Sequence, residues 1–474
     1  MTKDADFRID FVLLHISNIN DIINIFSPER RLSSIQKYWV SFFLSMMIRT
    51  NTLCWAVFER ACGKTACART MSFILRNSKI PWAALLKCST ILLISQLSLT
   101  SGILVIDDTE RPRSKVTSRI AFVFKMLNKK TGGYIKAQNL VVLLLVTPIV
   151  TIPVGFRFFT PCPVLSAWTK EDKETRNRRK AGEKGLKRPV KPERSPEHPS
   201  KNQIAAALIT EFKAQFPKIQ VTCILGDAAF GTKESTLDLE KIYSCPVISE
   251  LRCNQKVQSK NRTEKSVEAF FSAMAPISAQ IAIRDNEARK VEMVSARIKV
   301  VAHHRKLHVI ALRYEGEEDF RYLFCTDLRW RATDIIRAYT YRWLLEVFFS
   351  DWKCYEGWGQ AAMQRDETGS LCGVTLSLLL DQCLLLHPEQ IRRIKANKPA
   401  CTVGSLLEKI RLEDHLDSVR RLLDHDDPWK ELEKYAARMR SVIILRDSKK
   451  HLTGRTMEPL APRISLAAKF KHAS

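Results

Sequence analysis

Two aspartates occupy positions where a pair of divalent metal ions would find oxygen ligands. Asp108 follows the apolar run Ile103–Ile106, and Asp227 follows a second apolar run that ends at Leu225. Apolar runs of this length are typical of β-strands, and a strand end lies at the rim of a sheet, where ligands gather in open α/β folds. Taken alone, either aspartate is more often a turn or capping residue.

A third acidic residue, Glu346, lies in the segment Ile335–Trp352, which predicts a buried helix because apolar side chains occur on almost every side of it. Tyr339, Arg342, Glu346 and Lys353 are spaced by 3, 4 and 7 residues, and at about 100° per residue they fall within an arc of roughly 60°. A local ion pair between Arg342 and Glu346 would explain two of the four. A carboxylate inside an apolar element needs a cation, which a metal ion shared with both aspartates would supply.

The elements that must position these residues differ along the chain. Residues 1 to about 100 predict helices, whereas β-strand signals begin at Gly102. The apolar run Leu140–Val154 is too short for a membrane span and is interrupted by proline, so we expect two buried strands joined by a turn. A long helix is predicted to begin near Thr333, and helices also dominate from about Thr375.

Charge points to the class of partner. The segment from Lys170 to Arg194 contains eleven Lys or Arg residues against five Asp or Glu residues, which predicts a solvated loop or linker that is mobile unless DNA or a partner orders it. The whole chain of 474 residues carries a formal net charge of +26. This balance favours a polyanionic partner, most commonly nucleic acid, over the alternative of a basic enzyme surface with no such partner.

Other metal centres and compartments are disfavoured. The thirteen cysteines include no Cys-x-x-Cys pair, so neither a zinc ribbon nor a disulfide framework is predicted. His303, His304 and His308 lie on neighbouring strand segments and are more typical of structural or exposed histidines than of metal ligands. The N-terminal residues lack the basic-then-apolar pattern of a secretory signal. We therefore expect a protein of the cytoplasm with no membrane partner.

Several of these segments together resemble one enzyme family. The order Tyr339-x2-Arg342-x3-Glu346-x6-Lys353 resembles the Tyr-Arg-Glu-Lys (YREK) signature of bacterial insertion-sequence DDE transposases that carry a β-rich insertion. Ile106–Thr109 resembles the strand that bears their first aspartate, and Gly226–Gly231 resembles the second. Residues 247–255 are similar to a further stretch of these proteins. The resemblance covers roughly Gly102 to Gly357.

The resemblance implies an α/β fold with a ribonuclease-H-like catalytic core. The catalytic and metal-binding residues would be Asp108, Asp227 and Glu346. They would hold two Mg²⁺ ions, which Mn²⁺ can replace, for in-line phosphoryl transfer on DNA. The residues that grip phosphates near the transposon end would be Tyr339, Arg342 and Lys353.

The first aspartate is a choice between neighbours. Either Asp107 or Asp108 can align with the family's first aspartate, and successive residues of a strand face opposite sides, so only one can reach the metal ions. We choose Asp108, because the Asp-Thr pair matches the family better. Glu250 and Cys253 stand where the family has Gln and Ser, which leaves open that this copy has lost its activity.

The family likeness also implies a division of the chain. In order, the parts would be a helical DNA-binding region at 1–100, the first part of the catalytic core at 101–244 with a basic loop at 170–200, the β-rich insertion at 245–328, the final catalytic-core helix region at 329–374, and a helical C-terminal region at 375–474 for dimer contacts.

The implied function is DNA transposition, with metal-dependent cleavage at transposon ends followed by strand transfer into target DNA. The partners would be the terminal inverted repeats and the target DNA, bound by a homodimer at the bacterial nucleoid. Two alternatives stay open. One is a ribonuclease-H-like nuclease without strand transfer, and the other is a DNA-binding remnant that has lost catalysis.

Overall fold

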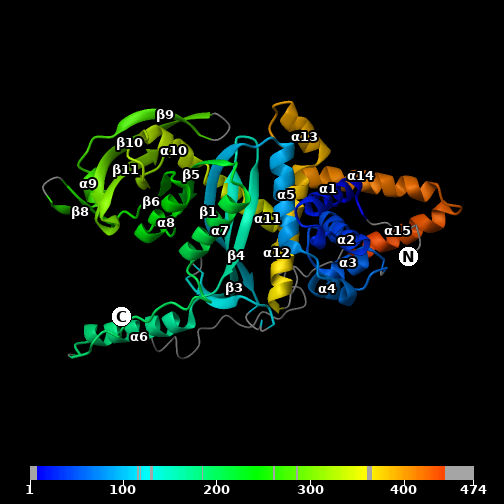
Figure 1. The fold of residues 1–474 in the computed structure, drawn as a ribbon, viewed down its shortest axis with the longest axis horizontal. Coiled ribbons are helices and arrows are strands. Elements are labelled where there is room, and N and C mark those ends of the chain that lie inside the picture. The colour runs from blue at the N-terminus through cyan, green and yellow to red at the C-terminus, as the bar shows by residue number, and fades with distance from the viewer. Residues whose placement is uncertain are drawn as a thin grey trace, which may run out of the picture.

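The computed structural model describes residues 8–442 except 64, 115–116, 118, 129–131, 184, 260–261, 284–286 and 360–365. Within these residues, one sheet of twelve strands occupies one half of the molecule, and most of the helices gather in the other half (Figure 1). The mixed α/β class expected from the sequence is confirmed.

The first half of the sheet has the order β2-β3-β1-β5-β6, with β4 paired to β3. Strands β1, β5 and β6 run parallel to one another, and β3 is antiparallel to β1. The bounds are β1 (Ser101–Arg113), β2 (Val123–Leu127), β3 (Tyr134–Val146), β4 (Thr151–Phe159), β5 (Gln220–Gly226) and β6 (Val247–Glu250).

Two hydrophobic cores lie on opposite faces of this half-sheet. Val105 of β1 packs in the core shared with the N-terminal helices, α11 (Trp343–Cys354) and α12 (Asp366–Leu385). Its neighbours Leu104 and Ile106 pack in the core shared with α7 (Lys201–Gln215) and α8 (Lys233–Tyr243). Successive side chains of a strand point to opposite faces, so the parity of a position in β1 decides which helices it meets.

The apolar run Leu140–Val154 forms the end of β3 and the start of β4, as predicted. Residues 140–146 are all buried. The turn between the strands is closed by Thr147, whose Oγ1 accepts a 3.0 Å hydrogen bond from the backbone N–H of Val150. The run is therefore sheet core.

The second half of the sheet continues from β6 in the order β12-β11-β10-β7-β8, with β9 paired to β10. The segment expected to be a β-rich insertion, residues 245–328, forms strands that extend the same sheet. The bounds are β7 (Lys256–Gln258), β8 (Glu264–Ser266), β9 (Ile277–Ile283), β10 (Glu287–Val300), β11 (Arg305–Tyr314) and β12 (Arg321–Cys325), with the short helix α9 (Val267–Phe271) after β8.

Helices from the two ends of the chain pack together. The N-terminal ones are α1 (Asp10–Phe26), α2 (Ser34–Thr50), α3 (Trp55–Ala61), α4 (Ala68–Asn77) and α5 (Trp82–Gln96). The C-terminal ones are α12, α13 (Pro388–Lys395), α14 (Val403–Leu423) and α15 (Pro428–Val442). Among the residues described, α12 alone is long and apolar enough to cross a membrane as a single helix, and 83% of its most apolar stretch is buried within the protein.

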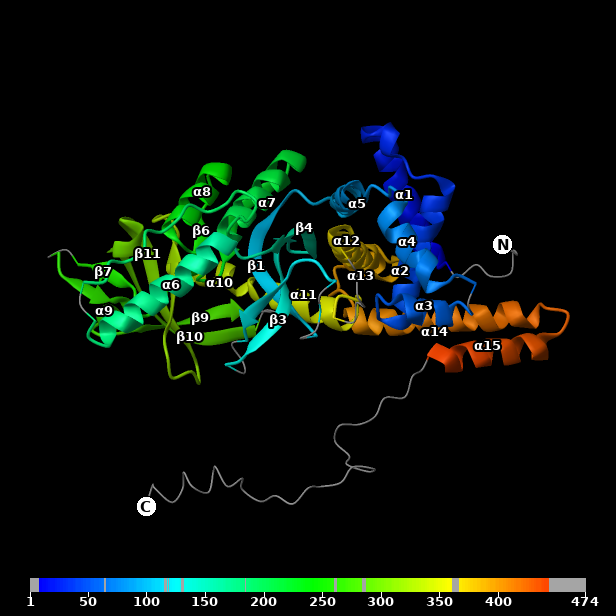
Figure 2. The ribbon, with the colours of Figure 1, turned by 90° about the horizontal axis from the view of Figure 1, so that it is seen from below.

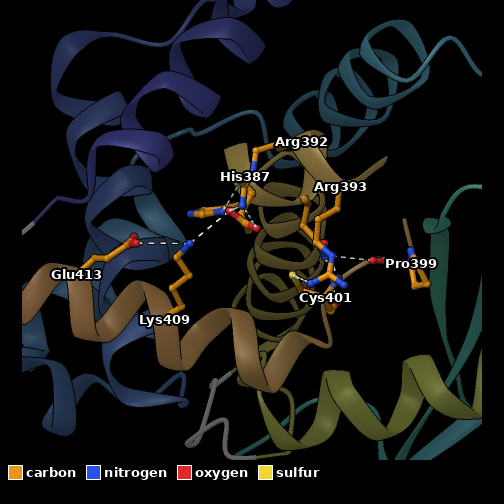
Figure 3. Close-up of polar contacts among 9 residues, drawn as sticks. His387, Arg392, Arg393, Pro399, Cys401, Lys409 and Glu413 are labelled. Atoms are coloured by element: carbon orange, nitrogen blue, oxygen red, sulfur yellow. Dashed lines mark hydrogen bonds and ion pairs between the residues drawn. The ribbon is translucent and has the colours of Figure 1, made fainter. Parts of the chain in front are cut away.

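Polar contacts fix the turn between α13 and α14 (Figure 3). Arg393 donates from Nε to the carbonyl oxygen of Pro399 at 2.8 Å. Lys409 of α14 donates from Nζ to Glu389 of α13 at 3.3 Å. These contacts orient α14, which runs out from the body of the protein and returns as α15 (Figure 2).

Two elements differ from the sequence prediction. The basic segment from Lys170 is not wholly a loop, because its first part belongs to helix α6 (Pro163–Lys180). The helix predicted from Thr333 is interrupted after α10 (Ala332–Thr340), where Tyr341 and Arg342 donate to carbonyl groups three residues back. Such i→i+3 bonds tighten the last turn and end the regular α-helix.

Candidate active site

Strands β1 and β5 bring Asp107 and Asp227 side by side. Val105 pairs with Leu225 in the parallel register, and each aspartate lies two residues further along the chain, Asp107 within β1 and Asp227 directly after β5. Val105 and Leu225 both pack in the core on the α11 face. The alternation of strand side chains therefore places both aspartates on that face as well.

Asp107 is held in a largely buried position, with 15% of its side chain exposed. Its Oδ2 accepts a 3.0 Å hydrogen bond from Nη1 of Arg342. Burial and the nearby charge of Asp227 raise the pKa of Asp107 to about 7, although Arg342 opposes the rise. Two carboxylates held this close repel each other, and a cation between them would favour the ionised form of both.

Asp227 is fixed by the turn that follows β5. Its Oδ1 accepts hydrogen bonds from the backbone N–H groups of Ala229 at 2.9 Å and Phe230 at 3.3 Å. Its carbonyl oxygen accepts from Oγ of Ser249 at 2.7 Å. A Cβ added at Gly231 would lie 2.3 Å from that Oγ, so the turn requires glycine there. The backbone of Asp227 is thus tied to the neighbouring strand β6.

Asp108 points to the opposite face of the sheet. Its Oδ2 accepts a 2.7 Å contact from Nζ of Lys201, the first residue of α7, and a 2.6 Å hydrogen bond from Nδ2 of Asn139 on β3. The physical reason is the pleat of β1, which sends Asp108 toward the α7 core together with Ile106. The structure therefore brings Asp107 beside Asp227, and does not bring Asp108 there.

Glu346 reaches the same region through Arg342. Nη2 of Arg342 donates to Oε1 of Glu346 at 2.6 Å while Nη1 donates to Asp107, so one guanidinium joins the two carboxylates. The prediction that this helix is buried on all sides is wrong, because α11 buries only one face, and Trp343 and Val347 are exposed together with Glu346. The carboxylate of Glu346 is 43% exposed at the surface.

Tyr339 and Lys353 flank this group on the polar side of the helix pair. Burial, followed by the nearby charge of Glu250, raises the pKa of Tyr339 above its usual range. Nζ of Lys353 lies 5.7 Å from the ring centroid of Phe349, one turn earlier on α11. Tyr339 therefore lies close to the carboxylates, whereas Lys353 lies two helical turns beyond Glu346, near the C-terminal end of α11.

Glu250 is an acidic residue of this site that the sequence analysis treated only as a departure from the family. Leu225 pairs with Ile248 in the parallel register of β5 and β6, so Glu250 lies next to Asp227 at the end of the third parallel strand. Ile248 packs in the core on the α11 face, which gives Glu250 the face of Asp107 and Asp227. The sequence signal for Glu250 was the apolar run Val247–Ile248 before it, which is similar to the apolar runs before Asp107 and Asp227.

The donor set suits a hard divalent cation. Asp107, Asp227 and Glu346 offer only carboxylate oxygens, the ligand type that Mg²⁺ and Mn²⁺ prefer. Within the described part of the chain, no three His, Cys, Asp or Glu side chains are yet close enough together to hold a metal ion. The positively charged guanidinium of Arg342, and not a metal ion, pairs with both Asp107 and Glu346. Asp107, Asp227 and Glu346 therefore suit Mg²⁺ or Mn²⁺ in the chemistry of their oxygen ligands, and the strand register already brings the two aspartates together.

The three histidines of the β-rich region are separate from this site. His303 is buried, and burial lowers its pKa to about 4. His308 is also buried, and its Nδ1 lies 3.0 Å from the carbonyl oxygen of Trp330. His304 follows a short turn and is exposed, with a φ of 53°. These residues have structural or surface positions.

Comparison with known proteins places these carboxylates in a family context. A family model described as DDE superfamily endonuclease matches residues 57–267, which include Asp107, Asp108 and Asp227. No curated protein matches the chain. Among solved structures, the piggyBac transposase in a synaptic complex with hairpin DNA is similar at 10% identity and a TM-score of 0.43, over 96% of this chain and 89% of that chain. The DDE superfamily endonuclease model thus covers the strands β1 and β5 that bring Asp107 and Asp227 together.

Proposed function

We propose that this protein is a DDE transposase and that Asp107, Asp227 and Glu346 are its three catalytic carboxylates. Asp107 takes the role that the sequence analysis assigned to Asp108. The observation that carries the proposal is the register of β1 and β5, which pairs Asp107 with Asp227 on the face that Glu346 reaches through Arg342. Asp108 is already engaged by Lys201 and Asn139 on the other face.

Divalent metal ions, Mg²⁺ or in its place Mn²⁺, would be held by Asp107, Asp227 and Glu346. When bound, they would supply an activated water or 3′-hydroxyl and stabilisation of the leaving oxygen. The carboxylate of Asp227 is held in position by hydrogen bonds from the turn after β5, and the carboxylate of Asp107 is held by its largely buried position and its contact with Arg342. The raised pKa of Asp107 means that a cation is needed for it to be fully ionised near neutral pH.

Arg342 would act first on the protein and then on DNA. In the free protein it balances the charges of Asp107 and Glu346. When these carboxylates gain another cation, the guanidinium is released to bind a phosphate oxygen of the transposon end, for which its planar fork is suited. Tyr339 and Lys353 would contact phosphates from the same side of α10 and α11. This assignment follows the YREK resemblance to bacterial insertion-sequence enzymes.

The order of elements supports a ribonuclease-H-like core within residues 101–374. Strand β1 pairs with β3, and β3 with β4; α7 follows and leads to β5, which pairs with β1. The strands from 256 to 325 interrupt this order before α10 and α11, as an insertion would. In this proposal the N-terminal helices recognise the terminal repeats in the bacterial cytoplasm.

A homodimer is supported by one face of α14. Leu412, Leu416, Val419 and Leu423 are all exposed and lie opposite the buried residues of that helix. Their spacing of 4, 3 and 4 residues is typical of a coiled-coil seam and reads the same in both directions. A second copy running antiparallel would set Leu412 opposite Leu423 and Leu416 opposite Val419. It would also set Glu413 of each copy on the side of Arg420 of the other.

Strand transfer separates a transposase from a nuclease of the same fold. With pre-cleaved element ends that carry a free 3′-hydroxyl, we expect the protein with Mg²⁺ to join them to a target plasmid. Cleavage of intact ends without joining would instead establish the nuclease. Binding of the ends with neither reaction would establish an inactive DNA-binding remnant.

A further inference from the structure

A basic arm connects strand β4 to helix α7. We define the basic arm as α6 (Pro163–Lys180) and the returning segment, of which residues 181–183 and 185–200 are described. Figure 1 shows α6 apart from the other helices and strands, and in the view of Figure 2 it lies in front of the half of the sheet that contains β10 and β11. Among the described residues of α6, only Asp172 is buried. A helix that buries so few side chains must be held in place by other contacts.

The order comes from contacts between α6 and the returning segment. The carboxylate of Asp172 is 3% exposed and accepts from Nε of Arg188 at 2.7 Å and from Nη2 of Arg176 at 3.2 Å. Nε1 of Trp168 donates to the carbonyl oxygen of Pro189 at 3.0 Å. The guanidinium of Arg188 also lies 5.5 Å from the ring centroid of Trp168. These contacts fasten the segment along the helix, so that the two form one body.

The outer surface of the basic arm is strongly positive. The segment from 170 to 194 has eleven Lys or Arg residues against five Asp or Glu residues. Two of those acids are used within the arm, because Asp172 pairs with Arg176 and Arg188, and Glu183 pairs with Arg178. Exposed lysines for which the described residues include no ion pair are Lys170, Lys173, Lys180, Lys187 and Lys191. The internal pairing thus leaves the excess charge facing solvent.

Both ends of the basic arm lie near Asp108, the neighbour of Asp107 on β1, on the opposite face of the sheet. Strand β4 ends at Phe159, which pairs with Asn139 of β3, and Asn139 is the residue that donates to Asp108. The returning segment ends where α7 begins, at Lys201, whose Nζ contacts Asp108 and lies 5.3 Å from the ring centroid of Phe159. The basic arm is therefore anchored one residue along β1 from Asp107.

We propose that the basic arm binds the phosphate backbone of the DNA duplex whose end lies in the active site. The inference rests on the proposed function for its substrate, and it adds a binding surface outside the YREK residues. The arm presents lysines along one ordered helix without a set of base-reading side chains, so it contributes affinity and position with little sequence preference. Because the basic arm is already ordered in the free protein, less conformational entropy is lost when it binds DNA.

Salt dependence measures the phosphate contacts directly. The variant Lys170→Gln, Lys173→Gln, Lys180→Gln, Lys187→Gln removes four charges from the arm. A matched control removes four exposed lysines elsewhere, Lys218→Gln, Lys241→Gln, Lys265→Gln, Lys290→Gln. Binding of a fluorescent 30-base-pair duplex is followed by anisotropy from low to high salt. For the arm variant we expect the slope of log K against log salt to fall by up to about 3.6, because each of the four lost contacts removes roughly 0.9. The control should keep the wild-type slope.

A second variant separates the ordered arm from charge alone. Asp172→Ala makes the arm more positive but removes the carboxylate that fastens it, and we expect weaker binding, by about 3- to 10-fold. Equal slopes for the arm variant and the control would overturn the proposal and would point to an acidic protein as the partner. Tighter binding by Asp172→Ala would overturn the role of the ordered arm. Failure of the wild-type protein to bind any duplex would refute the proposed function itself.

Discussion

Nη1 of Arg342 lies 3.0 Å from Oδ2 of Asp107, although the two residues are 235 positions apart in the chain. The contact joins the helix that carries the YREK-like residues to the strand that carries the first aspartate. The same guanidinium donates to Glu346. Arg342 is therefore the residue through which the parts of the site are assembled in the free protein.

Arg342→Lys keeps the positive charge but loses the planar fork that spans Asp107 and Glu346. We expect cleavage of transposon ends to fall by about 10²-fold, because misplacement of catalytic groups by about 1 Å costs that much. The measurement is a single-turnover cleavage assay with Mg²⁺. Arg337→Lys on α10, an exposed arginine one turn earlier, should keep wild-type activity. Wild-type activity in Arg342→Lys would show that the fork is not needed.

Lys201→Met tests the structural role of Asp108. The pair is largely shielded, with 29% and 21% of the two side chains exposed, so its loss should lower the free energy of unfolding by about 1–2 kcal/mol. Urea unfolding monitored by tryptophan fluorescence measures this. The exposed control Lys218→Met should stay within about 0.5 kcal/mol of the wild type. Unchanged stability with abolished DNA cleavage would contradict a purely structural Asp108–Lys201 pair.

A buried pair of acids should make stability depend on pH. Glu356 and Asp381 lie together in the core, and burial raises both pKa values, that of Asp381 to about 8. Between the unfolded pKa near 4 and the folded value, the folded state holds more protons than the unfolded state. Stability from this pair is therefore fully present at low pH and is lost as the pH rises toward 8.

The matching variant is Asp381→Asn, which keeps the shape but cannot ionise. We expect the free energy of unfolding of the wild type to decline between pH 5 and 8 by up to about 1.4 kcal/mol per pH unit for each proton retained. The variant should show a smaller decline, measured by denaturant unfolding across that range. A steeper decline in the variant than in the wild type would mean that Asp381 is ionised in the folded protein.

The exposed seam of α14 predicts self-association. Leu416→Glu places a charge in the middle of the seam, where it cannot be solvated in the proposed antiparallel pair. We expect a shift from dimer to the 54.3 kDa monomer by sedimentation equilibrium, with the thermal transition of the monomer unchanged. Ile277→Glu, an equally drastic change at another exposed apolar residue, should not alter the mass. A wild-type protein that is monomeric alone and with DNA would refute the seam.

Much of the site followed from local sequence, and the rest depended on tertiary packing. Apolar runs ending in acidic residues indicated strands that end at Asp107/Asp108 and at Asp227. Both strands are present, and β5 ends before Asp227 as expected, but β1 continues past Asp107 and Asp108 to Arg113. The choice between Asp107 and Asp108 depended on which face of β1 meets α11, because both flanking faces are equally apolar. Local sequence does not indicate which face of β1 packs against α11.

Two further differences have the same origin. The run Ile335–Trp352 looked buried on all sides, but α11 covers the sheet with only one face, and its other apolar side chains reach solvent. The basic segment looked like a loop because its charges predict solvation, yet Asp172 and Trp168 order it through contacts with residues 188 and 189. Long-range partners of this kind are not visible in composition or periodicity.

The central claim is that Asp107, rather than Asp108, acts with Asp227. Asp107→Asn and Asp108→Asn are compared for Mg²⁺-dependent nicking of labelled transposon ends, with end binding measured in parallel to confirm that each variant is folded and loaded. We predict that Asp107→Asn binds ends but loses about 10³-fold or more in cleavage rate, whereas Asp108→Asn stays within about 10-fold of the wild type. Normal cleavage by Asp107→Asn together with loss of cleavage in Asp108→Asn would contradict the account.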